Sequence, residues 1–216
     1  MAVVMTYGSL LDQLVNWNER PNDSKLLANA PTIISQSEFM LARELKNLLF
    51  QKSVTGFFTV GSAGAVLPKP ARWREMAVFS CGTGTNNLTV SEIYPRPYSY
   101  CRQYAPDPTS LGTPKYYCDY QFTYLLVVSS PDAAYPYEMV YYESPPPLGT
   151  DQTTNQLTSF VPDLMWKAAQ LTASQYLEDD TLIARYSGIY DRALATLKAE
   201  GLARLEDGGQ DASGDT

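Results

Sequence analysis

The sequence predicts an α+β fold, in which a helical bundle built from both chain ends carries an inserted antiparallel β-domain. Three observations support this prediction. Apolar residues recur at helical spacing near both ends of the chain. Between them, short segments alternate apolar and polar residues, as half-buried strands do. Three consecutive prolines at 145–147 then end the last alternating segment, because proline has no N–H to donate to a β-ladder.

The first part of the chain predicts two helices. The first covers residues 6–20, with Thr6 as its N-cap. Its apolar side consists of Leu10, Leu11, Leu14, Val15 and Trp17. The second begins near Pro31, which fits the first turn of a helix, and ends at about Leu49. Its apolar stripe consists of Ile33, Ile34, Leu41, Leu45 and Leu48.

The middle of the chain predicts about five to seven antiparallel strands. Residues 54–68 indicate a hairpin with a glycine-rich tip, and residues 76–90 indicate two strands joined by a Gly/Asn turn. Residues 115–128 predict one long strand that pairs with residues 137–143. One face of that strand collects the even-numbered side chains Tyr116, Cys118, Tyr120, Phe122, Tyr124, Leu126 and Val128.

Helical spacing returns after the prolines. Pro162 opens a helix that ends near Tyr176, and Asp179 and Asp180 begin the last helix. The apolar stripe of that last helix consists of Leu182, Tyr186, Ile189, Ala193 and Leu197.

The predicted domains follow from this order of elements. Residues 1–52 and 148–205 form a discontinuous helical bundle domain, and residues 53–147 form the inserted antiparallel β-domain. Residues 206–216 form a disordered acidic tail, because Glu206, Asp207, Asp211 and Asp215 have no basic neighbour there.

Composition argues against catalysis. The 216 residues contain no histidine, which is the usual acid or base near neutral pH and the commonest metal ligand. The segment CGTGTNN, residues 81–87, lacks the third glycine and the following helix of a dinucleotide site. We therefore assign no catalytic, cofactor-binding or metal-binding residue, and we expect a protein that is not an enzyme.

Other features indicate a soluble protein that is not secreted. The N-terminus lacks a basic region followed by a long apolar run, and no segment has enough apolar residues to span a bilayer. The three cysteines include no C-x-x-C pair, which predicts reduced thiols. The formal net charge of -7 shows no basic face for nucleic acid.

Aromatic segments supply the candidate interface. PARWRE, residues 70–75, places two arginines around a tryptophan, as in a subunit contact, a strand edge or a nucleic-acid contact. The 16 tyrosines offer a protein interface or a glycan platform, or simply a core face with ordinary surface. The candidate interface residues are Arg72, Trp73, Arg74, Tyr116, Tyr117 and Tyr142.

Several segments resemble one known family. They are MTYGSLLDQLVNWNERPND, KPARWRE, YPRPYSYCRQYAPDP, GTPKYYCDY, AYPYEMVYYESPPPL, VPDLMWKAA and ARYSGIYDRAL. Together they span nearly the full chain, in the expected order. They are similar to the adaptor, or head-to-tail connector, proteins of short-tailed bacteriophages, which include the tail tubular protein A-like proteins.

The resemblance implies a structural virion protein without cofactors or catalytic residues. It implies a homo-oligomeric ring of about a dozen copies, a dodecamer, that joins the portal protein to the tail nozzle protein. DNA would pass through its lumen without sequence-specific binding, and no membrane would be involved. The protein would assemble in the host cytoplasm and lie at the head-to-tail interface of the virion.

Two other functions stay open. A carbohydrate-binding or other ligand-binding β-module would use the tyrosine-rich face. A histidine-free hydrolase with paired carboxylates such as Asp107 and Asp119 ranks last, because their spacing gives it no support.

Overall fold

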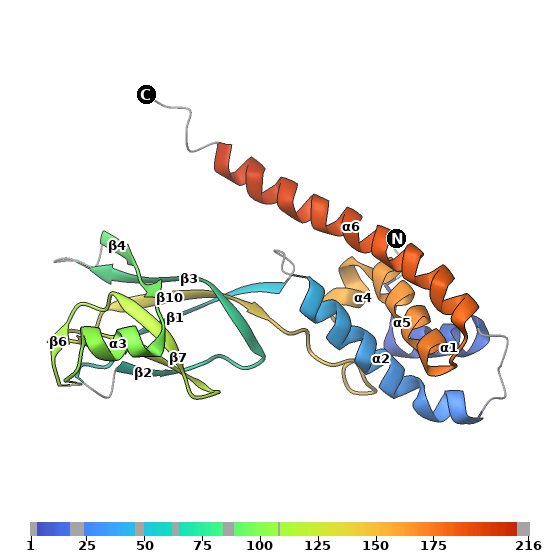
Figure 1. Ribbon diagram of the computed structural model, residues 1–216, viewed down its shortest axis with the longest axis horizontal. Coiled ribbons are helices and arrows are strands. Elements are labelled where there is room, and N and C mark those ends of the chain that lie inside the picture. The colour runs from blue at the N-terminus through green and yellow to red at the C-terminus, as the bar shows by residue number, and fades with distance from the viewer. Residues whose placement is uncertain are drawn as a thin grey trace. The chain divides into compact units, whose positions relative to one another are not determined.

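The computed structural model describes residues 4–17, 24–45, 50–61, 65–83, 89–107 and 109–210. These residues form six helices and ten strands (Figure 1). The chain divides into two compact units, Met1–Phe50 with Ser144–Thr216 and Gln51–Glu143. We call them the helical unit and the β unit. The predicted combination of helices with antiparallel sheets is confirmed.

Helix α1, Tyr7–Trp17, begins at the predicted N-cap. The Ser9 N–H donates to Thr6 Oγ1 over 3.2 Å, and the Thr6 N–H donates to Ser9 Oγ over 2.9 Å. This reciprocal pair satisfies two backbone donors at the start of the helix. Leu10 and Leu14 are fully buried, as the apolar spacing predicts. Residues 18–20 of the predicted helix lie outside the described residues.

Helix α2, Ser24–Glu44, corrects two predicted boundaries. It begins before Pro31, which lies inside the helix and leaves one backbone carbonyl without its usual N–H partner. The segment before Pro31 is rich in good helix formers, and Leu26 and Ala30 are fully buried, so packing offsets the lost hydrogen bond. The helix also ends before the predicted Leu49, and residues 46–49 lie outside the described residues.

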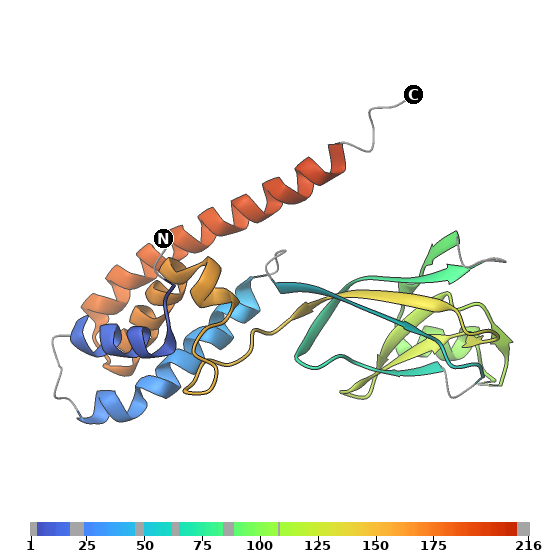
Figure 2. The ribbon, with the colours of Figure 1, turned by 180° about the vertical axis from the view of Figure 1, so that it is seen from behind.

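Helix α5, Pro162–Tyr176, contacts α1, α2, α4 and α6 within the helical unit (Figure 2). Its bounds confirm the predicted start and end. Helix α4, Gln156–Phe160, precedes it and was not predicted. The buried residues of α5 include Leu164, Met165, Ala168, Ala169, Leu171 and Ala173.

The last helix, α6, covers Asp180–Gln210. The Asp179 side chain accepts hydrogen bonds from the Thr181 and Leu182 N–H groups, each over 3.1 Å, which caps the helix as its acidic start predicts. Between residues 180 and 201, its buried side chains are those of Tyr186, Tyr190 and Leu194. The predicted stripe is therefore only partly right, since Ile189 is 37% exposed.

The predicted disordered tail also needs correction. Residues 206–210 continue α6, and residues 211–216 lie outside the described residues. Extending an existing helix adds one hydrogen bond for each residue ordered, whereas starting one is costly. The preceding run AEGLARLE consists mostly of good helix formers, so the helix passes the point where acidic composition predicts disorder.

A buried polar network holds the segment that follows the prolines. Asn155 Oδ1 accepts from the Leu157 and Thr158 N–H groups and so caps α4. Asn155 Nδ2 donates to Glu38 Oε1 of α2 over 2.6 Å and to the Pro146 carbonyl over 2.9 Å. Both the Asn155 and Glu38 side chains are buried. The network therefore ties the returning chain to α2.

Glu38 should give the helical unit a distinctive pH dependence. Burial raises the pKa of its carboxyl above 4.5, against the lowering effect of hydrogen bonds from Leu148 and Asn155. A raised folded-state pKa means that the stability contribution is full below pH 4.5 and is lost as pH rises through the folded-state pKa. The unfolding free energy of the wild type relative to Glu38→Gln should therefore increase as pH falls from neutrality. Urea unfolding of both proteins across this range tests this, and a falling difference would contradict it.

Two four-stranded sheets make up most of the β unit. The first has the order β1-β10-β3-β4, entirely antiparallel. Its strands are β1 Gln51–Phe57, β10 Pro136–Glu143, β3 Trp73–Thr83 and β4 Thr89–Glu92. The second has the order β2-β8-β7-β5, in which β5 runs parallel to β7. Its strands are β2 Val66–Pro68, β8 Tyr124–Val128, β7 Tyr116–Tyr120 and β5 Tyr94–Pro95.

Side chains from both sheets share one hydrophobic core. It consists of Phe58, Leu67, Phe79, Cys81, Ile93, Leu125, Val127 and Met139. Strands β6, Leu111–Gly112, and β9, Ser130–Pro131, form a small parallel pair, and helix α3, Tyr98–Tyr104, follows β5. Met139 and Tyr141 of β10 are buried, which agrees with the alternation in its sequence.

The backbone of Gly56 in β1 lies close to the Tyr137 side chain. A Cβ at this position would lie 2.6 Å from the Tyr137 hydroxyl oxygen, so a side chain would displace that ring. The Tyr137 ring in turn lies 4.9 Å from the Phe58 ring, centroid to centroid. Glycine at this position therefore allows the aromatic packing of the core.

The strand pairing differs from the prediction in three places. Residues 54–68 are not a hairpin, because β1 pairs with β10 and β2 pairs with β8. Residues 115–128 form the β7–β8 hairpin rather than one strand, and they do not pair with residues 137–143. The chain turns at Gln121, whose φ is 57°, and leaves Phe122 93% exposed. The predicted pairing of the strands on either side of the Gly/Asn turn is confirmed by β3 and β4.

Candidate subunit interface

A groove of about 590 Å³ opens on the β unit between β3 of the first sheet and β5 and β7 of the second. Three candidate interface residues, Trp73, Arg74 and Tyr117, line it. Arg96 and Tyr98 line it as well. The structure thus brings together two segments more than 40 residues apart in the sequence.

The groove exists because β3 is paired unequally on its two sides. Strand β10 pairs along most of β3, whereas β4 pairs only with Ser80–Thr83. Within the described residues, the first half of β3 has no strand on the β4 side. The edge from Trp73 to Met76 therefore borders the groove, where a partner can approach it.

Charges along the groove are fixed by short contacts. Lys69 Nζ lies 2.8 Å from Asp119 Oδ1 and 5.9 Å from the centroid of the Trp73 ring. Burial lowers the pKa of Arg74, and the charge of Glu75 partly opposes this.

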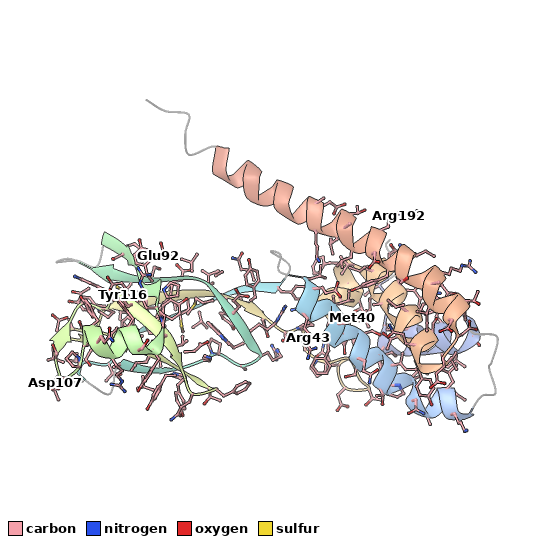
Figure 3. All side chains as sticks on the ribbon, in the orientation of Figure 1. Met40, Arg43, Glu92, Asp107, Tyr116 and Arg192 are labelled. Atoms are coloured by element: carbon pink, nitrogen blue, oxygen red, sulfur yellow. The ribbon has the colours of Figure 1, made fainter. Side chains whose placement is uncertain are left out.

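Tyrosines and arginines lie on the neighbouring surface, where α3 contacts β7. Tyr116 of β7, labelled in Figure 3, belongs to it. We define the tyrosine–arginine surface as Arg96, Tyr98, Tyr100, Arg102, Tyr104 and Tyr116. The three tyrosines of α3 are between 39% and 46% exposed. Because Arg96 and Tyr98 also line the groove, the two features are continuous.

Ring contacts hold this surface in place. The Tyr116 ring meets the Tyr100 and Tyr104 rings edge to face, with centroids 5.4 Å and 5.0 Å apart. The Arg96 guanidinium lies 5.5 Å from the Tyr100 centroid. Arg102 Nε donates to the Tyr98 hydroxyl over 2.9 Å, and this hydrogen bond raises the pKa of Arg102. Exposed tyrosine and arginine held in this way are typical of protein-binding sites.

Comparison with known proteins gives the family. A sequence model of the SU10 adaptor protein family matches residues 5–213, nearly the whole chain. The chain belongs to the SU10 adaptor protein family. The resemblance to phage head-to-tail adaptors is thereby confirmed, although the likeness to tail tubular protein A stays a prediction. No curated protein matches the chain.

Membership of this family indicates the general role of the protein. Adaptors of this family are structural proteins of the phage virion rather than enzymes, and they interact with portal and tail proteins. In the part of the chain that the structure describes, no helix combines the length and the hydropathy of a membrane span.

Two candidate interface residues of this adaptor, Arg72 and Tyr142, do not line the groove, whereas Tyr116 belongs to the tyrosine–arginine surface. Arg72, with a φ of 54°, forms an ion pair with the buried Glu143, which also lies 2.6 Å from Lys52 Nζ. Arg72 thus neutralises a buried carboxylate. Tyr142 is half-buried on β10, opposite Glu75 of β3.

Two of the groove residues also support the core. The Trp73 ring stacks on Tyr141, with centroids 5.2 Å apart. The Tyr117 ring meets Phe79 at 5.5 Å, and burial raises its pKa to about 12. Each side chain therefore joins the groove to the packing beneath it.

Sequence reasoning missed the contribution of α3. Its residues lie in the segment YPRPYSYCRQY, which we used for the resemblance but did not predict as a helix. The available signal was the spacing of four between Tyr98 and Arg102 and between Tyr100 and Tyr104, directly after Pro97. A helix of this length was too short for apolar periodicity to show.

The three cysteines and the two carboxylates Asp107 and Asp119 are the other groups that could carry chemistry. No group of three or more His, Cys, Asp or Glu side chains within the described ranges could hold a metal ion. Cys81, Cys101 and Cys118 are buried free thiols, and burial raises the pKa of each. Asp107 is hydrogen-bonded to Thr109, whereas Asp119 contacts Lys69, so the two carboxylates have separate partners.

Proposed function

We propose that this adaptor forms a homo-oligomeric ring of about a dozen copies, a dodecamer, between the portal and the tail nozzle. DNA passes through the lumen without sequence-specific binding. The ring assembles in the host cytoplasm and becomes part of the head-to-tail interface of the virion. The observation that carries this proposal is the family match over residues 5–213.

We also propose that the chain has two domains. Residues 1–52 and 148–205 are the discontinuous helical bundle domain, and residues 53–147 are the inserted β-domain. The contacts of α5 with α1 and α2 from one chain end, and with α6 from the other, support this division. In the ring, the tyrosine–arginine surface and the groove serve as contacts between subunits, and Trp73, Arg74, Tyr116 and Tyr117 belong to them.

Ring formation should depend on the portal. The mean hydropathy of the chain is -0.24, and its most exposed large apolar side chains, Val90, Phe122 and Phe160, lie at separate places along the chain, so isolated copies should associate weakly. A portal ring holds docking sites side by side, which raises the effective concentration of neighbouring copies. We expect a monomer of about 24.0 kDa at micromolar concentration and a complete ring after portal is added.

Mass photometry with and without portal measures this outcome. A stable ring in the absence of portal would contradict the templated assembly. Failure to associate with portal would contradict the adaptor function itself.

The groove also favours one alternative, a carbohydrate-binding or other ligand-binding β-module. Its volume is typical of small-ligand sites, and Trp73, Tyr98 and Tyr117 line it. Titration with glycans, followed by tryptophan fluorescence, tests this function. Saturable quenching that is lost in Tyr98→Ala, which keeps the Trp73 fluorophore, would support the alternative, whereas a signal that glycans leave unchanged would leave the adaptor function.

A further inference from the structure

The C-terminal half of α6 has few partners within the helical unit. Between residues 191 and 201, the side chain of Leu194 alone is buried. In the helical unit, this part of α6 passes beyond the other helices (Figures 1 and 2). An isolated helix is only marginally stable in water, so a second surface is expected to cover it.

This end of the chain is also strongly acidic. Residues 205–216 contain Glu206, Asp207, Asp211 and Asp215 and no lysine or arginine. The β unit holds equal numbers of acidic and basic residues, so the net charge of -7 belongs to the helical unit. Helical units of neighbouring copies repel one another, and an acidic segment gains most from a cationic surface on a β unit.

The groove and the tyrosine–arginine surface provide such a region. Their cations are Arg74, Arg96 and Arg102, against the carboxylates of Glu75 and Asp119, and Lys69 lies beside the Trp73 ring of the groove. Lys69 already pairs with Asp119. Arg96 and Arg102 lie over tyrosine rings, so their guanidinium groups are held in position before a partner arrives.

Apolar side chains accompany these charges both in the groove and in the C-terminal segment. Trp73, Pro97 and Tyr98 line the groove. The acidic segment begins with Leu205 and follows Leu202. A segment that combines leucines with carboxylates is therefore complementary to the groove in both polarity and charge.

We propose that the C-terminal segment of one copy, residues 202–216, which contains Leu202, Arg204 and the four acidic residues from Glu206 on, binds the groove and the tyrosine–arginine surface of a second copy. The proposal rests on the proposed ring, in which each copy has a neighbour. It gives the lateral contact a specific pair of surfaces, one acidic and one cationic.

A labelled peptide of residues 200–216 tests the contact in trans. We expect fluorescence anisotropy to show saturable binding to the full-length chain. The variant with Arg96→Gln and Arg102→Gln should bind the peptide about tenfold more weakly. The matched control carries Arg185→Gln and Arg192→Gln, two exposed arginines of α6, and should bind as the wild type does. Circular dichroism checks that both variants are folded.

Four results would overturn the proposal. The first is equal binding by the two variants. The second is binding of a peptide in which Glu206, Asp207, Asp211 and Asp215 are replaced by the corresponding amides. The third concerns a full-length chain in which the same four acidic residues are replaced by amides. If the peptide binds this variant but not the wild type, the segment of the wild type already occupies the groove of its own copy. Binding of a short DNA duplex at Arg96 and Arg102, without peptide binding, would also overturn it in favour of nucleic acid.

Assembly on portal separates this proposal from the adaptor function. If wild type and the Arg96→Gln, Arg102→Gln variant form equally complete rings, the contact is wrong and the adaptor function stands. If the variant docks but leaves incomplete rings, the contact is supported. If the wild type does not associate with portal, the adaptor function fails irrespective of the peptide result.

Discussion

Replacing Phe79 by alanine is expected to lower the free energy of unfolding of the β unit by about 4 kcal/mol. The side chain is 1% exposed and lies in the core that the two sheets share. Its ring contacts those of Phe58, Tyr117 and Tyr137, with centroids 6.2, 5.5 and 6.0 Å apart. Truncation removes these contacts and leaves a cavity that rings from several strands cannot fill without moving.

Val78→Ala is the matched control for this change. Val78 is the neighbouring residue of β3, but its side chain is 45% exposed. It should change the free energy of unfolding by less than about 0.5 kcal/mol. Urea unfolding of the three proteins measures the difference, and equal losses in both variants would mean that the inner face of β3 has been misassigned.

Asn155→Ala should lower the free energy of unfolding of the helical unit by about 3 kcal/mol. The change removes the N-cap of α4 and leaves the buried Glu38 carboxylate with too few hydrogen-bond donors. The Leu157 and Thr158 N–H groups lose their acceptor. Glu38 loses its donor at 2.6 Å and keeps only the Leu148 N–H in this network. A buried carboxylate without enough donors is costly.

The exposed residue Asp151, in the same segment between β10 and α4, offers a control. Asp151→Ala should change the free energy of unfolding by less than about 0.5 kcal/mol. Combining Asn155→Ala with Glu38→Gln should recover part of the loss, because no charge then remains buried. If the double variant is as unstable as the sum of the single ones, the two side chains are not coupled.

Local chemistry in the sequence determined several boundaries correctly. Thr6 caps α1, Pro162 opens α5 and Asp179 caps α6, and each depends on side chains within a few residues of the helix start. The alternation in β10 likewise indicates its buried face. Such features are predictable because the interacting groups are close in sequence, so the residue types at fixed spacing contain the information.

The candidate site was predictable only in part. Trp73, Arg74 and Tyr117 stood out by composition, and the structure places all three around one groove. Arg102 and the tyrosines of α3 were missed, because the role of this helix depends on its packing against β7. Arg72 looked equivalent to Arg74, but its ion pair with Glu143 involves a residue 71 positions away in the sequence.

Tertiary structure alone decided the remaining features. Strand β1 pairs with β10 instead of β2, and residues 115–128 fold back at Gln121 instead of continuing as one strand. Pro31 stays inside a helix because residues on the preceding turns are buried. Alternation shows which face of a strand is apolar, but it does not show which strand lies beside it. That choice depends on how side chains from distant segments fill one shared core, and a local pattern does not contain it.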